Sequence, residues 1–288
     1  MIPAQFDYVA PATLDEAVKL LSDHTDDAKI LAGGHSLIPA MKLRLAMPQM
    51  LIDISRIKGL SYIREQGGQI LIGAMTTHYQ IESSDRLKTA CPLLPETAAQ
   101  IGDVQVRNKG TIGGSIVHAD PAADWPAAIL ALGAEMVAVG SKGERVIKAD
   151  DFFVDMLTSA LAAGEILREI RIPAPQGRFG QTYLKAPQPA SGFAVVGVAV
   201  SLTRDQKGAC ASASVSITGV ASKAYRATGV ETALKGSALD AGAIADAAAH
   251  AADGIDANGD LYASAEYRRH LARVYTRRAI EAAASRAK

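Results

Sequence analysis

Cysteine is scarce in this sequence, since its 288 residues contain only Cys91 and Cys210. An iron–sulfur cluster normally takes four thiolate ligands, so this chain by itself cannot hold one. The two cysteines also lie far apart, without the spacing of a metal site. We expect both to be reduced and partly buried, and a disulfide between them is the less favoured alternative.

The sequence also lacks an excess of charge and a long apolar run. Its 30 basic residues balance its 30 acidic residues, whereas a general nucleic-acid binder normally carries a basic excess or stripe, so we expect no nucleic-acid partner. The longest apolar stretch, residues 194–202, is too short to span a bilayer. The first residues lack the basic region and the apolar run of a secretory signal. We therefore expect a cytoplasmic protein without a transmembrane segment.

Several well-known motifs are absent as well. There is no G-x-x-x-x-G-K-[ST] sequence, which excludes a P-loop, and no G-x-G-x-x-G follows a predicted strand, which excludes the usual dinucleotide fingerprint. The metalloprotease motif H-E-x-x-H and the nucleophile elbow G-x-S-x-G are also missing. We therefore predict no catalytic residue and no metal ligand in this chain. Such a chain is expected to rely on a cofactor that carries the chemistry itself.

Two double-glycine segments stand out among the residues that are present. The first is 31–37 (LAGGHSL) and the second is 110–115 (GTIGGS). Glycine permits backbone conformations closed to other residues, and the missing Cβ lets a ligand approach the main chain. Successive N–H groups in such segments can form an anion-binding concavity. Each segment alone is more often an ordinary turn, but two facing segments would suit the diphosphate of a dinucleotide.

Hydrophobic periodicity predicts a chain of mixed helices and strands. A capping box at 13–16 opens a helix, and a strand over 29–32 runs into the first double-glycine segment, the end of a strand where ligands usually bind. A hairpin over 60–74 turns at Gly67 and Gly68. The second double-glycine segment is predicted to be a loop after the polar stretch 105–109.

The composition changes at residues 173–177 (PAPQG), which is the best candidate for a linker. Beyond it, three strands are predicted at 181–185, 193–203 and 209–220, and the rest of the chain reads as helical. Strands followed by helices favour an α+β module.

The two double-glycine segments and their flanks resemble a known family. Residues 104–115 (VQVRNKGTIGGS) and 118–124 (HADPAAD) closely resemble the FAD-binding medium subunit of the molybdenum hydroxylases, the xanthine dehydrogenase and carbon monoxide dehydrogenase family. Residues 32–37 (AGGHSL) match the other flavin motif of that family. Residues 72–77 (IGAMTT) and 266–269 (EYRR) also look familial, so the resemblance covers essentially the whole chain.

The resemblance implies an α+β fold with two domains. Residues 1–176 would form a two-lobed FAD-binding domain of the vanillyl-alcohol-oxidase (PCMH) type, with lobes at about 1–57 and 58–176. Residues 177–288 would form a C-terminal domain of the carbon monoxide dehydrogenase flavoprotein type, a three-stranded antiparallel sheet with helices.

The resemblance also implies a set of cofactor-binding residues, with the FAD diphosphate on both double-glycine segments. Ile101 would pack near the adenine and Phe193 would cover the isoalloxazine ring. For His35, hydrogen bonding or packing is favoured over proton transfer. The full set is Ala32, Gly33, Gly34, His35, Ser36, Leu37, Ile101, Thr111, Ile112, Gly113, Gly114, Ser115, Asp124, Leu167, Lys185 and Phe193.

Two residues depart from the family pattern. Carbon monoxide dehydrogenase subunits tend to have Asp-Tyr where this chain has Gly192 and Phe193, and the family often has Asn where this chain has Ser115. A phenylalanine can stack on the ring but cannot donate a hydrogen bond. Both departures weigh against a direct assignment to carbon monoxide oxidation.

The implied function is electron transfer within a larger complex. A large subunit with the molybdenum cofactor would oxidise the substrate, and two [2Fe–2S] clusters on a small subunit would pass electrons to FAD. We expect a dimer of such heterotrimers. The alternatives are a flavin-free assembly subunit and a free-standing flavin oxidase, and the substrate stays open among carbon monoxide, an aldehyde and an N-heterocycle such as nicotine or a purine.

One further feature is a row of arginines on the predicted C-terminal helix, Arg269, Arg273 and Arg277. Their spacing places them on one helical face. They indicate either a solvated face or a contact with an acidic patch on a partner subunit.

Overall fold

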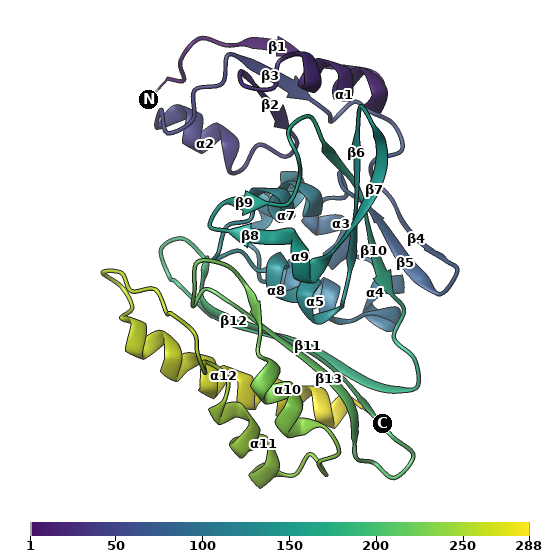
Figure 1. Cartoon of the computed structure of the whole chain (residues 1–288), viewed down its shortest axis with the longest axis vertical. Coiled ribbons are helices and arrows are strands. Elements are labelled where there is room, and N and C mark those ends of the chain that lie inside the picture. Colours follow the sequence, from purple (N-terminus) through teal and green to yellow (C-terminus); the bar gives the residue numbers. More distant parts are fainter. Residues whose placement is uncertain (1, 288) are drawn as a thin grey trace.

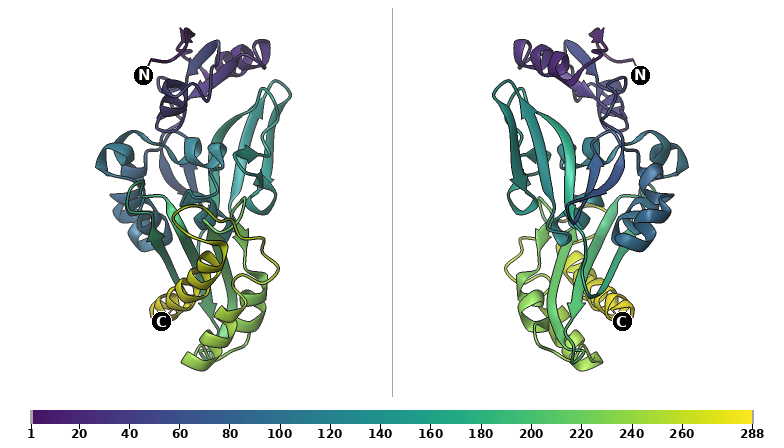
Figure 2. Two further views of the ribbon diagram at one scale, coloured as in Figure 1. Left: turned by 90° about the vertical axis from the view of Figure 1, so that its left-hand side faces the viewer. Right: turned by 90° about the vertical axis from the view of Figure 1, so that its right-hand side faces the viewer.

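The structure is a computed structural model that describes residues 2–287 of the chain. Three larger sheets follow one another along an elongated molecule, and the two ends of the chain lie at its opposite ends (Figures 1 and 2). The mixture of helices and strands confirms the predicted α+β class. None of the helices within residues 2–287 is long and apolar enough to cross a membrane.

The N-terminal part is a three-stranded parallel sheet in the order β1-β3-β2. Thr13 caps α1, because its side chain accepts the N–H of Glu16 as the sequence predicts. The apolar face of α1 is buried against this sheet and the neighbouring one. The elements are β1 (Asp7–Val9), α1 (Leu14–Asp23), β2 (Ala28–Leu31), α2 (Leu37–Lys42) and β3 (Met50–Asp53).

The central sheet has five antiparallel strands in the order β4-β5-β10-β6-β7. Gly67 and Gly68 form the predicted two-residue turn between β4 and β5, and both have positive φ angles, 60° and 75°. That conformation matches the twist of a hairpin and favours glycine. The strands are β4 (Ile63–Gln66), β5 (Gln69–Gly73), β6 (Glu135–Gly140), β7 (Gly143–Lys148) and β10 (Ile166–Pro173).

Short helices and a small hairpin pack around the central sheet. Their apolar side chains, with the buried Trp125 and Phe152 among them, form one core with the strands. They are α3 (His78–Glu82), α4 (Asp85–Ala90), α5 (Leu93–Ala99), α6 (Val104–Lys109), α7 (Ile112–His118), α8 (Trp125–Ala131), α9 (Ala149–Phe152), β8 (Phe153–Asp155) and β9 (Thr158–Ser159).

The C-terminal part is an antiparallel sheet whose three long strands were predicted, and a two-residue strand adds a fourth. The sheet lies between α5 and α8 on one side and α10, α11 and α12 on the other (Figure 1). Gly180 lets α12 rest directly on β11, since a Cβ there would collide with the carbonyl oxygen of Ala283. The elements are β11 (Arg178–Pro187), β12 (Ala194–Arg204), β13 (Cys210–Thr218), β14 (Tyr225–Arg226), α10 (Thr228–Leu234), α11 (Ala241–Ala249) and α12 (Ala265–Arg286).

Two local predictions differ from the structure. The second double-glycine segment is the first turn of α7 rather than a loop, because the side chain of Thr111 accepts the N–H of Gly114 as an N-cap. The polar stretch before it is also helical, since Asp103 caps α6 in the same way. Glycine is a poor helix former, so helix propensity alone did not indicate that α6 ends just before Gly110 and that α7 begins at Ile112. Cys91 and Cys210 are free, as expected, and both are completely buried rather than partly so.

Candidate flavin site

The structure brings the two double-glycine segments into direct contact. A Cβ on Gly33 would collide with the carbonyl oxygen of Lys109 and would lie 2.8 Å from the Cα of Gly110. A Cβ on Gly114 would lie 3.6 Å from the Cβ of Ala32. Residues that are far apart in sequence therefore form one continuous surface, and the missing side chains are what allow this approach.

The first segment follows β2 and leaves its N–H groups unused. Within residues 2–287, the N–H groups of residues 33–36 donate no hydrogen bond to the protein, and the segment is partly exposed. Gly34 has a φ of +75°, the left-handed region that favours glycine. Leu37 then begins α2, whose second residue bonds back to the carbonyl of Gly34 at 3.0 Å. Consecutive free N–H groups are what an anion requires.

The second segment differs, because the N–H groups of its residues 112–115 are already bonded. It pairs with residues 74–78: Gly113 donates to the carbonyl of Ala74 at 2.9 Å, and Ile112 donates to that of Thr76 at 3.0 Å. The N–H of Gly114 is held by the Thr111 side chain at 3.1 Å. The expectation that this segment offers a concavity of free N–H groups is therefore wrong. What it presents instead is the exposed bare Cα of Gly114 and the half-buried Ser115.

Asp124 and Lys185 form a buried pair. The Nζ of Lys185 lies 2.9 Å from the Asp124 carboxylate, which also accepts the hydroxyl of Tyr183 at 2.5 Å. Burial raises the pKa of Asp124, while the ammonium of Lys185 opposes the shift, and this close donor set favours the ionised carboxylate. The ammonium also donates to the carbonyl of Gln100 at 2.8 Å, directly before Ile101. Three predicted site residues are thus linked.

Phe193 and Leu167 lie in contrasting surroundings. Phe193, on the turn between β11 and β12, is 44% exposed, which leaves its ring free to stack. The same turn approaches the residue after Ile101, since a Cβ on Gly192 would lie 3.8 Å from the Cα of Gly102. Leu167 on β10 is only 3% exposed and belongs to the core, so its side chain offers a cofactor almost no surface. The structure does not bring Leu167 to the exposed part of the site.

A buried histidine that sequence reasoning missed stands behind the second segment. The indole N–H of Trp125 donates to Nδ1 of His78 at 3.1 Å, so the neutral ring carries its proton on Nε2. Burial lowers the pKa of His78 to about 4, and the nearby His35 and Arg107 add to that shift. No motif marks this pair, because its members lie in separate parts of the sequence, although His78 follows the familial residues 72–77 and Trp125 follows the predicted site residue Asp124.

The three arginines of the row on α12 interact with other groups of the same chain. Arg273 donates to the carbonyl of Ala249 at the end of α11 (3.2 Å), and Arg269 donates to that of Ile255 (3.4 Å). Arg277 lies 3.8 Å from Glu281 on its own helix. A contact of this row with a partner subunit stays a prediction.

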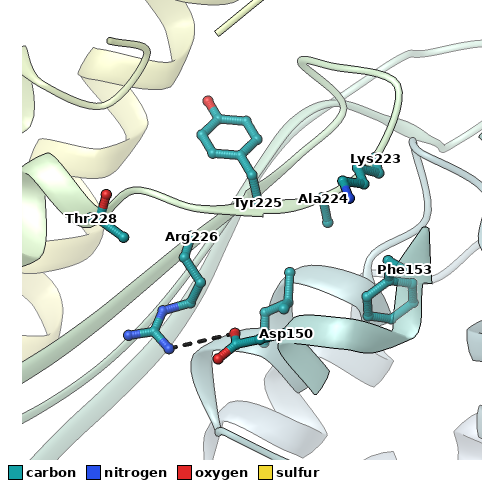
Figure 3. A pocket seen from close by; sticks show the side chains of 8 residues that line it. Asp150, Phe153, Lys223, Ala224, Tyr225, Arg226 and Thr228 are labelled. Atoms are coloured by element: carbon teal, nitrogen blue, oxygen red, sulfur yellow. Dashed lines mark ion pairs between the residues drawn. The ribbon is translucent and has the colours of Figure 1, made fainter. Parts of the chain in front are cut away.

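A cavity of about 400 Å³ lies apart from these residues, between α9 and the start of α10 (Figure 3). Arg226 crosses it to Asp150 at 3.7 Å and also pairs with Glu231 at 2.7 Å. Two of its charged lining residues are therefore paired with each other, the third, Lys223, is exposed, and the cavity shares no residue with the predicted flavin site. Among residues 2–287, no three His, Cys, Asp or Glu side chains are grouped so that they could hold a metal ion.

Comparison with known proteins identifies the family. The profile described as "FAD binding domain in molybdopterin dehydrogenase" matches residues 4–175, and "CO dehydrogenase flavoprotein C-terminal domain" matches residues 181–283. The chain is 42% identical to the carbon monoxide dehydrogenase medium chain of Afipia carboxidovorans, with 100% of both covered. It is 37% identical to the 6-hydroxypseudooxynicotine dehydrogenase complex subunit alpha of Paenarthrobacter nicotinovorans, covering 100% of this chain and 97% of that subunit.

Solved structures agree with these sequence relatives. A chain of carbon monoxide dehydrogenase from Hydrogenophaga pseudoflava superimposes with a TM-score of 0.97 at 42% identity, over 100% of both chains. A chain of quinoline 2-oxidoreductase from Pseudomonas putida 86 gives a TM-score of 0.92 at 34% identity, over 99% of both. The predicted resemblance and its cofactor, FAD, are confirmed: the chain belongs to the FAD-binding medium subunits of the molybdenum hydroxylases, of the carbon monoxide dehydrogenase type.

Proposed function

We propose that this subunit binds FAD across the contact between the two double-glycine segments and relays electrons from a partner's [2Fe–2S] clusters to an external acceptor. The observation that carries the proposal is the direct packing of residues 32–33 against 109–114, beside four unused N–H groups. When bound, the flavin supplies the redox chemistry, and the protein supplies binding and orientation. This division fits a chain in which sequence analysis finds no catalytic constellation.

The two segments would hold the diphosphate in different ways. The N–H groups of residues 33–36 would donate to the phosphate oxygens, which is the usual role of successive free amides. The exposed Cα of Gly114 would let the diphosphate lie close to the main chain. The hydroxyl of Ser115 would add a hydrogen-bond donor at the same place. Together, residues Ala32 to Leu37 and Thr111 to Ser115 form the surface that is proposed to hold the diphosphate, which we call the cradle.

The remaining proposed contacts lie around the turn that carries Phe193. Its exposed ring would stack on the isoalloxazine and shield one face from water. Ile101 would pack on the adenine, and the buried Asp124–Lys185 pair would fix the position of the segment that contains Ile101. Leu167 would support the site indirectly, because its buried side chain belongs to the core on which α7 packs and does not reach the exposed surface.

The proposed assembly follows the relatives' names, which describe medium chains and subunits of multi-subunit dehydrogenases. We propose a large subunit with the molybdenum cofactor, a small subunit with two [2Fe–2S] clusters, and a dimer of these heterotrimers in the cytoplasm. We further propose a division at residue 176, with lobes meeting near residue 57, and the family profiles that end at 175 and begin at 181 support it. The substrate stays open, since relatives are named for carbon monoxide, caffeine, nicotine and glyceraldehyde.

Substitution of Gly114 tests the proposed cradle. In Gly114→Val the Cβ would lie 2.9 Å from the Thr111 hydroxyl that caps α7, and the side chain would occupy the exposed surface beside Ala32, where the diphosphate is proposed to lie, so we expect loss of most bound flavin. Flavin per protein is measured from the visible absorbance of the purified complex. The control is Gly242→Val, which lies in the first turn of α11, where a Cβ would meet only Asp240 at 3.5 Å. Full flavin occupancy in Gly114→Val, with the control also unaffected, would reject the cradle.

A further inference from the structure

We infer that His78 is a positioning residue of the flavin site. Its imidazole ring lies between the second double-glycine segment and the segment of Asp124, and it sets the distance between them. The inference rests on the proposed function, because these are two of the segments that are proposed to bind FAD. It concerns a side chain that does not itself belong to the proposed set of cofactor contacts.

The first support is the short ladder that holds the second segment in place. His78 donates its backbone N–H to the carbonyl of Gly110 at 3.0 Å, and Thr77 forms an antiparallel bridge with Thr111. Together with the bonds from Ile112 and Gly113, this fixes residues 110–113 against residues 74–78. His78 lies at one end of the ladder and is therefore the residue that determines where the segment begins.

The imidazole ring of His78 closes the space behind this ladder. A Cβ on Gly110 would lie 2.7 Å from Nε2 and 2.9 Å from Cδ2 of the ring. The ring is thus packed directly against the bare Cα of Gly110, and only 3% of the residue is exposed. Any change in the size of this side chain would move the backbone that leads into Thr111.

The other side of the ring contacts the segment of Asp124. Trp125, fully buried, donates its indole N–H to Nδ1 of His78 at 3.1 Å. Trp125 begins α8 directly after Asp124, which binds Lys185 and Tyr183. The imidazole therefore spans from the second double-glycine segment to the start of α8, and the hydrogen bond fixes its orientation.

The chemistry of the ring suits this position better than that of other side chains. A neutral imidazole accepts one hydrogen bond at Nδ1 while it remains compact enough to be buried. A buried indole N–H without a partner is costly, so an aliphatic residue at position 78 would leave Trp125 unsatisfied. Asparagine retains an acceptor near the place of Nδ1, which makes it the conservative replacement.

The experiment compares FAD affinity in three variants of the full chain. His78→Leu removes the acceptor, Trp125→Phe removes the donor but keeps an aromatic ring, and His78→Asn keeps an acceptor. FAD is removed from the purified protein, and its rebinding is measured by titration together with the visible circular dichroism of the bound flavin. Hydrogen exchange of residues 110–115 in the flavin-free protein reports on the ladder directly. His270→Leu, an exposed histidine on α12, is the control.

We expect FAD affinity to fall by about tenfold or more in His78→Leu and Trp125→Phe, with faster hydrogen exchange at 110–115. His78→Asn should restore most of the affinity, and the effects of His78→Leu and Trp125→Phe should not add when combined. If the unmodified chain rebinds FAD and His78→Leu rebinds it equally well, the inference is rejected and the proposed function stands. If the unmodified chain takes up no FAD, the proposed function itself fails, and the inference fails with it.

Discussion

At the scale of single residues, glycine is required in the candidate site for three different physical reasons. Gly34 has a φ of +75°, so its backbone conformation is one that other residues adopt at a cost. Gly33 and Gly113 have no such angle, but a Cβ on either would collide with the main chain of a neighbouring segment. Gly114 is exposed and leaves the surface beside Ala32 free. Identical residues in the sequence therefore serve conformation, packing and access.

The buried His78 also leads us to predict how folding stability depends on pH. Burial holds its pKa at about 4, below the ordinary value of 6.5, and the nearby His35 and Arg107 add to the lowering. The unfolded chain therefore binds this proton more readily than the folded chain between those two values, and folding stability falls as the pH is lowered through that window. Below about pH 4 the loss levels off, because both states are then protonated.

The measurement is the free energy of unfolding of the flavin-free chain at pH 7 and pH 4.5. Relative to His78→Asn, which does not titrate, the unmodified chain is expected to lose about 2 kcal/mol on acidification. The difference between the two proteins' unfolding free energies cancels the contribution of the other titratable groups, which both proteins share. Parallel pH curves for the two proteins would contradict a buried neutral imidazole at this position.

At the scale of elements, the Asp124–Lys185 pair joins the start of α8 to β11. Both side chains are almost completely buried, so the pair is not screened by water as a surface ion pair would be. Removing one partner leaves the other charged and buried without compensation. The pair therefore ties the central core to the C-terminal sheet while it holds the segment of Ile101 through the carbonyl of Gln100.

We expect Lys185→Met to destabilise the flavin-free chain by about 3 kcal/mol, measured by denaturant unfolding. The matched control is Lys19→Met, which breaks the exposed pair of Lys19 with Asp23 and should change stability by less than about 1 kcal/mol. Flavin-free protein separates this effect from any loss of cofactor binding. Equal stability of the two variants would show that the buried pair adds nothing to the junction.

At the scale of the whole molecule, three larger sheets follow one another along the chain (Figure 1). The two double-glycine segments of the candidate site meet where Gly33, after the N-terminal strand β2, contacts Lys109 and Gly110 at the end of α6. Segments from the N-terminal sheet, the central helices and the C-terminal hairpin all contribute proposed contacts. In this arrangement the flavin would be held by elements that are distant in sequence. The substrate pocket of the complex is proposed to lie on another subunit, as the absence of a catalytic constellation in the sequence suggests.

This division of labour predicts that the isolated subunit is reducible but does not oxidise a substrate. Dithionite should bleach the flavin absorbance of the isolated chain, whereas carbon monoxide, an aldehyde or an N-heterocycle should leave it unchanged. The same compounds, tested on the complex with its partners, should bleach the flavin for the true substrate only. Reduction of the isolated chain's flavin by one of these compounds would favour a free-standing oxidase instead.

The sequence by itself determined the family, the cofactor and much of the secondary structure. The strand before the first double-glycine segment, the turn at Gly67 and Gly68, and the three long C-terminal strands follow from local periodicity and turn chemistry, which act over a few residues. Local signals also identified the two segments, although they did not show that the second begins a helix.

Only the tertiary structure decided how those segments work. It placed Gly33 against Lys109, bonded the N–H groups of Ile112 and Gly113 in the second segment to residues 74–76, and brought His78 to Trp125. These contacts join residues far apart in the chain, and a side chain's partners and burial depend on the packing of the whole core. The free N–H groups of the first segment and the occupied ones of the second therefore became distinguishable only once the chain was folded.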